Sequence, residues 1–93
     1  MEIADWRERI DAINAELLRL LNRRTECALE IAKLKRERGL PVCDPARERQ
    51  VIDAILAQNG GPLSNAQVEA VFRAVIAQTV LAEEGSEGGK EGR

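Results

Sequence analysis

The chain of 93 residues contains no histidine and no tyrosine, and its only aromatic side chains are Trp6 and Phe72. Without histidine, the sequence lacks the commonest general base and the residue needed for Ser-His-Asp or Cys-His nucleophiles. A catalytic function would therefore have to require little proton transfer. Scarce aromatics beside abundant Ala, Leu, Ile, Glu and Arg favour one small all-α domain over a sheet protein.

Long apolar runs are also absent. None approaches the roughly 18 residues needed to span a bilayer, and the N-terminus lacks the charged-then-apolar pattern of a signal peptide. Cys27 and Cys43 have no spacing that suggests a metal site or a disulfide framework, so they indicate free thiols in a reducing compartment. We therefore expect a soluble cytoplasmic protein with no membrane partner.

The predicted helices carry no one-sided basic surface. The 14 basic and 16 acidic residues are interspersed, and the net charge is −2. A nucleic-acid-binding protein usually presents a one-sided basic surface. The sequence therefore argues against nucleic acid as a partner.

The segment from Ile3 to Arg38 predicts one unbroken amphipathic helix. Apolar residues recur every three or four positions, and no glycine or proline interrupts them before Gly39 and Pro41. At 1.5 Å per residue the helix would be roughly 54 Å long, whereas a compact domain of this size has a radius of gyration of about 12 Å. The chain cannot enclose such a helix, so its apolar stripe predicts a partner, most simply in a symmetric homodimer.

Two cations interrupt this apolar stripe. Arg24 lies in its middle, and Lys35, eleven residues later, returns to within about 20° of the same side of the helix. Alone, Arg24 could be a register device or part of an ion pair, and Lys35 a snorkelling surface residue. Positions where a strong pattern fails are often functional, so both are candidate site residues.

Two shorter helices follow the long one. An Asp-Pro pair at residues 44–45 predicts an N-cap and first helical position, in a helix that runs to about Gln58. A Ser-Asn-Ala-Gln capping box at residues 64–67 predicts the start of a third helix. We expect the domain to occupy residues 1–84 and the glycine- and charge-rich tail of residues 85–93 to be disordered.

Several polar residues fall on otherwise apolar helix faces. Each alone has a structural explanation, such as a solvated helix start, a satisfied helical hydroxyl or a carboxylate at a frayed end. Together they would suit a small dianion, because arginine can bind a carboxylate bidentately while lysine offers a point charge. The set comprises Arg24, Lys35, Arg47, Glu48, Thr79 and Glu83.

Arg7 adds a geometric argument for the dimer. It precedes Arg24 by 17 residues on the same helix and so lies roughly 25 Å away. An antiparallel partner helix, with the twofold axis near Ala15 and Glu16, would bring Arg7 of one subunit level with Arg24 of the other. Such a dimer would form two equivalent sites, each with a borrowed arginine.

Four charged segments carry a family resemblance: R-E-R-I at Arg7, L-L-N-R-R ending at Arg24, K-L-K at residues 33–35 and P-V-C-D-P-A-R-E-R at residues 41–49. Through them the sequence resembles the all-helical (AroQ) class of chorismate mutases, over about residues 3–84. The resemblance implies an all-α homodimer with three helices per chain, one long and two shorter, interlocked around an antiparallel first helix. It also implies the Claisen rearrangement of chorismate to prephenate, on the way to phenylalanine and tyrosine.

The resemblance further implies a role for each matching position. Arg24 and, from the other subunit, Arg7 would bind the two carboxylates of chorismate. Lys35 would contact the ether oxygen and a carboxylate. Glu48 would accept the ring hydroxyl, and Thr79 takes a place that the family often fills with serine.

Further positions complete the implied site. Asp44 and Arg47 would shape the ring-hydroxyl side through the start of the second helix. A pericyclic step needs no nucleophile, general base, metal or cofactor, only a substrate held in its folded conformer and charge placed against the breaking C–O bond. Lys35 is the strongest candidate for that charge. The apolar walls would be Ile31, Val51, Ile76 and Val80.

Glu83 differs from the family members that have glutamine at this position. Glutamine can donate a hydrogen bond to the ether oxygen, whereas a carboxylate cannot, so Glu83 would have to be protonated in the complex. We therefore predict that activity rises on acidification, or that burial keeps Glu83 neutral at higher pH.

Two other interpretations remain open from the sequence. The first is isochorismate pyruvate lyase on the same fold, whose pocket also binds an enolpyruvyl dianion. The second is a helical dimerisation or regulatory module without catalytic function. Cations at buried positions argue against the second, because an interaction module has no need of them.

Overall fold

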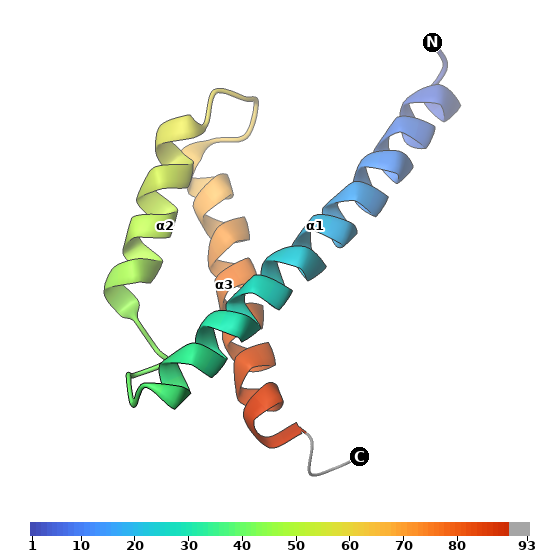
Figure 1. The fold of residues 1–93 in the computed structure, drawn as a ribbon. Helices are drawn as coiled ribbons and strands as arrows, with labels where there is room; N and C mark the ends of the chain where they lie inside the picture. Colours follow the sequence, from blue (N-terminus) through green and yellow to red (C-terminus); the bar gives the residue numbers. More distant parts are fainter. Residues whose placement is uncertain (90–93) are drawn as a thin grey trace.

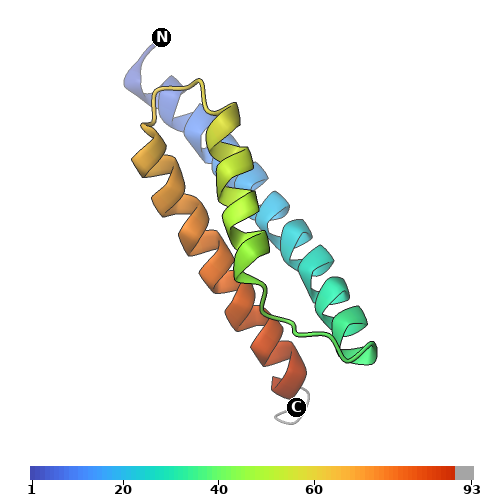
Figure 2. The ribbon, with the colours of Figure 1, turned by 90° about the vertical axis from the view of Figure 1, so that its left-hand side faces the viewer.

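Three α-helices make up the regular structure of the computed structural model, which describes residues 1–89, with side chains through residue 85 (Figure 1). Helix α1 spans Ile3–Glu37, α2 spans Pro45–Gln58 and α3 spans Asn65–Gly89. Helices α2 and α3 run antiparallel beside each other, and the C-terminal half of α1 crosses α3 (Figures 1 and 2). The prediction of an all-α chain with one long helix and two shorter ones is confirmed.

The ends of α1 follow from local hydrogen bonding. At its start, the Glu2 amide donates to Asp5 Oδ2 at 2.8 Å. The helix ends at Glu37, one residue before the predicted end at Arg38. Gly39 then turns the chain with a positive φ of 69°, a conformation that glycine adopts without a Cβ clash.

Both shorter helices begin at the predicted caps. Asp44 Oδ1 accepts from the amide of Arg47 at 3.1 Å, and Pro45 occupies the first turn of α2. At the start of α3, the Ser64 amide donates to Gln67 Oε1 at 2.9 Å and the Gln67 amide donates to Ser64 Oγ at 3.1 Å. This reciprocal pair is the predicted capping box.

The end of α3 lies later than the sequence predicts. The helix continues to Gly89, five residues into the segment that was expected to be a disordered tail beginning at Gly85. Glycine lowers helix propensity by about 1 kcal/mol but does not forbid intrahelical hydrogen bonds, so the helix can continue through it. The rest of the expected tail, residues 90–93, lies outside the described residues.

The core is small, and α3 is its centre because it contacts both other helices. Among the described side chains, the buried ones are Ala32, Ile52, Val68 and Thr79. The molecule is flat and open, with extents of 54 × 34 × 15 Å and a radius of gyration of 16.5 Å. A compact chain of this length would have a radius of about 12 Å, so much of its surface remains uncovered.

The N-terminal half of α1 stands away from α2 and α3 (Figure 1). Its apolar stripe is correspondingly exposed, and side chains that would normally be buried retain about half or more of their accessible surface. The chain therefore does not cover the stripe by itself, while the homodimer stays a prediction. The stripe in this half consists of Ile3, Trp6, Ile10, Ile13, Leu17 and Leu20.

Two further sequence features can be compared with the structure. Cys27 and Cys43 are exposed free thiols, as their spacing indicated. In the part of the chain that the structure describes, no helix is both long and apolar enough to cross a membrane.

Candidate active site

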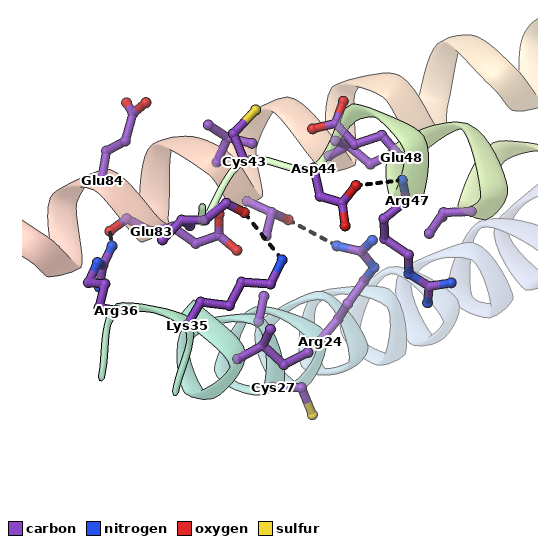
Figure 3. Close-up of a pocket in the computed structure, with 17 residues that line it drawn as sticks. Arg24, Cys27, Lys35, Arg36, Cys43, Asp44, Arg47, Glu48, Glu83 and Glu84 are labelled. Atoms are coloured by element: carbon purple, nitrogen blue, oxygen red, sulfur yellow. Dashed lines mark hydrogen bonds between the residues drawn. The ribbon is translucent and has the colours of Figure 1, made fainter. Parts of the chain in front are cut away.

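A cavity of about 470 Å³ opens between the C-terminal half of α1, the start of α2 and the C-terminal part of α3 (Figure 3). Eleven of the twelve predicted site residues line it, and Arg7 is the exception. Positions far apart in the sequence thus converge on one concave surface. The eleven are Arg24, Ile31, Lys35, Asp44, Arg47, Glu48, Val51, Ile76, Thr79, Val80 and Glu83.

Arg24 is held in place by α3. Its Nη1 donates to Thr79 Oγ1 at 3.0 Å, and the Thr79 hydroxyl donates to the backbone oxygen of Val75 at 2.8 Å. Thr79 is buried, with 9% of its surface exposed, and its proton is used on its own helix, so its oxygen is free to accept from the guanidinium. A guanidinium has five N–H donors, which leaves further donors of Arg24 to bind an anion.

Lys35 projects from the same side of α1 as Arg24, towards α3 (Figure 3). This common direction is what their eleven-residue spacing predicts. Lys35 Nζ donates to the backbone oxygen of Val42 in the α1–α2 loop at 3.4 Å, which is long for a hydrogen bond. The ammonium group can therefore exchange this weak contact for a ligand oxygen at little cost.

The start of α2 forms the polar side of the cavity. Asp44 caps this helix through the amide of Arg47, and the amide of Glu48 donates to the backbone oxygen of Asp44 at 3.1 Å. Asp44 and Arg47 are exposed, whereas Glu48 is half-buried. The cap thus fixes the first turn of α2 and with it the position of Glu48.

Glu83 has an altered proton affinity. Burial is the main cause and raises the pKa of its carboxyl, and the negative charge of Glu48 acts in the same direction. The positive charges of Lys35, Arg36 and Arg24 oppose this increase without cancelling it. Glu83 therefore keeps its proton to a higher pH than an ordinary glutamate.

The apolar walls come from all three helices. Val51 of α2 and Ile76 and Val80 of α3 are half-buried. Ile31 of α1 also lines the cavity but is 53% exposed. The wall on the α1 side is thus the more open one in the single chain.

Sequence reasoning missed several residues that line the cavity. Arg36 follows Arg24 by twelve residues, which places it about 120° away around α1, so the apolar stripe could not reveal it. Cys27 lines the cavity edge, but its side chain points away from Arg24 and Lys35 (Figure 3). The complete set of missed residues is Cys27, Ala28, Arg36, Val42, Cys43 and Glu84.

Arg7 lies outside the cavity, on the exposed N-terminal half of α1. Its 17-residue separation from Arg24 corresponds to roughly 25 Å along the helix. Within one chain the two arginines therefore do not meet.

Taken together, the fold and the cavity define an all-helical domain with a pocket in which cationic and carboxyl side chains face apolar walls. Residues 6–84 match the family model described as Chorismate mutase type II. The chain belongs to the chorismate mutase type II family, and the resemblance inferred from the four charged segments is confirmed.

Individual relatives agree with this assignment. A solved structure of chorismate mutase (Form II) from Thermus thermophilus superposes with a TM-score of 0.86 at 34% identity, covering 88% of this chain and 93% of that one. The bifunctional chorismate mutase/prephenate dehydratase of Aquifex aeolicus is 35% identical over 79 residues, covering 81% of this chain and 22% of the relative. The chorismate mutase of Methanocaldococcus jannaschii is 35% identical over 54 residues, covering 58% of this chain and 54% of the relative. The chain thus spans about a fifth of the bifunctional relative's length.

Proposed function

We propose that this domain catalyses the Claisen rearrangement of chorismate to prephenate, in phenylalanine and tyrosine biosynthesis. The observation that carries the proposal is the placement of Arg24 and Lys35 in one cavity with Thr79 and Glu83, in a chain of the type II family. Ligand cavities of roughly 300–1,000 Å³ suit small molecules, and this one has about 470 Å³.

The reaction explains which groups the site needs. Within one substrate molecule, an ether C–O bond breaks and a new C–C bond forms as three electron pairs shift, and no proton enters or leaves. The enzyme has only to hold the folded conformer and stabilise negative charge on the ether oxygen. A chain without histidine can do both with cations and hydrogen-bond donors.

Two cations serve the anionic parts of the substrate. Arg24, held by Thr79, binds one carboxylate through its remaining N–H donors. Lys35 leaves Val42 and donates to the ether oxygen and a carboxylate as the C–O bond breaks. The fixed position of Arg24 supplies electrostatic preorganisation that accelerates the reaction.

Polar groups of α2 and α3 complete the site. Glu48 accepts the ring hydroxyl, with Asp44 and Arg47 holding the first turn of α2 around it. Glu83, with its raised pKa, donates its carboxyl proton in a hydrogen bond to the ether oxygen. The apolar walls exclude water from the ring.

The working unit in this proposal is a homodimer. The exposed stripe on the N-terminal half of α1 packs against a second copy running antiparallel, which would remove a large apolar surface from water. Arg7 then enters the cavity of the partner subunit and binds the second carboxylate. The open α1 side of the cavity, where Ile31 is exposed, is consistent with a site completed by another chain.

The substrate assay tests the reaction directly. Purified protein is offered chorismate and isochorismate in separate reactions. Prephenate from chorismate supports the proposal, whereas salicylate and pyruvate from isochorismate would identify a lyase on the same fold. Turnover of neither substrate would leave the interaction-module interpretation.

A mixing experiment tests the shared site. The Arg7→Ala and Arg24→Ala proteins should each be nearly inactive, because every site in either homodimer lacks one arginine. A 1:1 mixture that has exchanged subunits should recover about a quarter of wild-type activity, because half of the dimers are mixed and each has one intact site. Recovery of no activity, with exchange shown by mass spectrometry, would contradict the borrowed arginine.

A further inference from the structure

Arg36 makes a contact that its neighbours in the last turn of α1 do not provide. Its Nη2 donates to the backbone oxygen of Glu83 at 2.9 Å (Figure 3). Glu83 lies 47 residues away on α3, so this hydrogen bond joins two helices rather than stabilising one. Arg36 is half-buried at this contact and lines the cavity beside Lys35.

Two arginines of α1 therefore fasten consecutive turns of α3. Arg24 donates to Thr79 and Arg36 donates to the backbone of Glu83. Thr79 and Glu83 are four residues apart, which is about one helical turn. Between these two attachments lies Val80, which lines the cavity.

The sequence at the end of α3 explains why a contact from Arg36 would matter there. Beyond Glu83 the sequence contains Gly85, Gly88 and Gly89, and each glycine weakens helix by about 1 kcal/mol relative to alanine. Arg36 thus binds α3 beside the segment whose sequence has the lowest helix propensity.

The positive charge of Arg36 also acts on the side chain of Glu83. The charged groups that act on the Glu83 carboxyl are Lys35, Arg36 and Arg24 of α1 and Glu48 of α2. The three cations lower the pKa of Glu83, while burial and Glu48 raise it. Removing the Arg36 charge would therefore raise this pKa further.

We propose that Arg36 is a positioning residue, which holds the Glu83 turn of α3 against α1 so that the Glu83 side chain faces the reacting ether oxygen. The proposal rests on the proposed function for its catalytic consequence. The Arg36 side chain itself acts through the Glu83 backbone rather than through the substrate.

The test separates position from charge with three variants. Arg36→Met removes both the hydrogen bond and the charge, Arg36→Lys keeps the charge, and Arg38→Met is the matched control. Arg38 lies two residues away at the exposed C-cap of α1 and is not among the charges that act on Glu83. For each protein, kcat and KM are measured across pH, and NMR follows the Glu83 carboxyl in the substrate-free protein.

For Arg36→Met, the low-pH plateau of kcat should fall roughly tenfold with a much smaller change in KM, because small misplacements of a reacting group are costly. The pH at which kcat declines should move upward, together with the NMR titration of Glu83. Arg36→Lys should restore the titration and part of the plateau, and Arg38→Met should match wild type in both.

Each outcome decides the proposal. A folded Arg36→Met protein with wild-type plateau and titration would overturn it, as would an equal effect of Arg38→Met. If Arg36→Met does not fold, Arg36→Gln repeats the test, with a reduced plateau and a raised Glu83 titration as the expected result and wild-type values as the contrary one. If wild type does not rearrange chorismate, the proposed function fails, while the NMR titration still tests whether Arg36 acts on Glu83.

Discussion

The two halves of α1 share one helix and one apolar period but have different surroundings. Along residues 3–22 every side chain is exposed, including the whole apolar stripe. From Arg24 onward the helix crosses α3, Ala32 is buried, and the cations are half-buried at the cavity. The same periodic pattern thus leaves an exposed apolar face at one end and lines the cavity at the other. A regular apolar stripe predicts that a helix face packs against another surface. The cations that interrupt the stripe mark the part of that face that lines the cavity.

The largest effect should come from the C-terminal half of α1, which lines the cavity. Arg24→Ala removes a cation fixed by Thr79 and should lower kcat/KM for chorismate by about a thousandfold, a loss at the upper end for one preorganised donor. Steady-state kinetics measure it, with Arg23→Ala as the control because Arg23 is exposed and does not line the cavity. A loss below tenfold in a folded Arg24→Ala protein would remove Arg24 from the catalytic role.

The next effect should come from the N-terminal half. Leu17→Glu places a charge in the exposed apolar stripe, so the protein should become monomeric at micromolar concentration and lose activity about a hundredfold as the partner's arginine is lost. Light scattering and the chorismate assay report the two changes together. Arg19→Glu introduces the same residue about 200° around the helix and should leave the dimer intact. A monomeric wild-type protein would contradict the prediction that the N-terminal half of α1 forms a dimer contact.

A smaller effect concerns Glu83 of α3, which faces the C-terminal half of α1 across the cavity and should make kcat depend on pH. Its raised pKa predicts that kcat is highest at acidic pH and declines as pH rises through that pKa, because only the protonated carboxyl donates to the ether oxygen. Glu83→Gln donates at every pH, so its profile should stay flat over the same range. The measurement is a pH–rate profile of both proteins; two identical flat profiles would exclude the carboxyl from this role.

The smallest effect is on folding. Because the folded state raises the pKa of Glu83, it binds this proton more tightly than the unfolded chain does. The free energy of unfolding should therefore decrease as pH rises from the unfolded pKa through the folded one. Urea unfolding across this interval should show a shallower decrease for Glu83→Gln than for wild type. An equal slope would mean that the Glu83 carboxyl is as solvated in the folded chain as in the unfolded one.

Local sequence signals predicted most of the helical structure. Asp44 followed by Pro45 fixed the start of α2, and the capping box at Ser64 fixed that of α3, since these caps act through hydrogen bonds within one turn. The end of α3 was predicted less well. Glycine composition suggested an end near Glu84, whereas the helix runs to Gly89 because glycine weakens a helix without a sharp stop.

The sequence alone determined the long helix, its uncovered stripe, the absence of histidine chemistry and the two cations on one side of α1. These follow from helical period and residue type, which need no knowledge of neighbours. Only the tertiary structure decided which groups meet across helices. Arg36 lies about 120° from the stripe, so its bond to Glu83 depended on where α3 crosses α1. The proton affinity of Glu83 likewise depends on burial and on charges from two other helices. No local sequence pattern encodes how close those charges come to the Glu83 carboxyl.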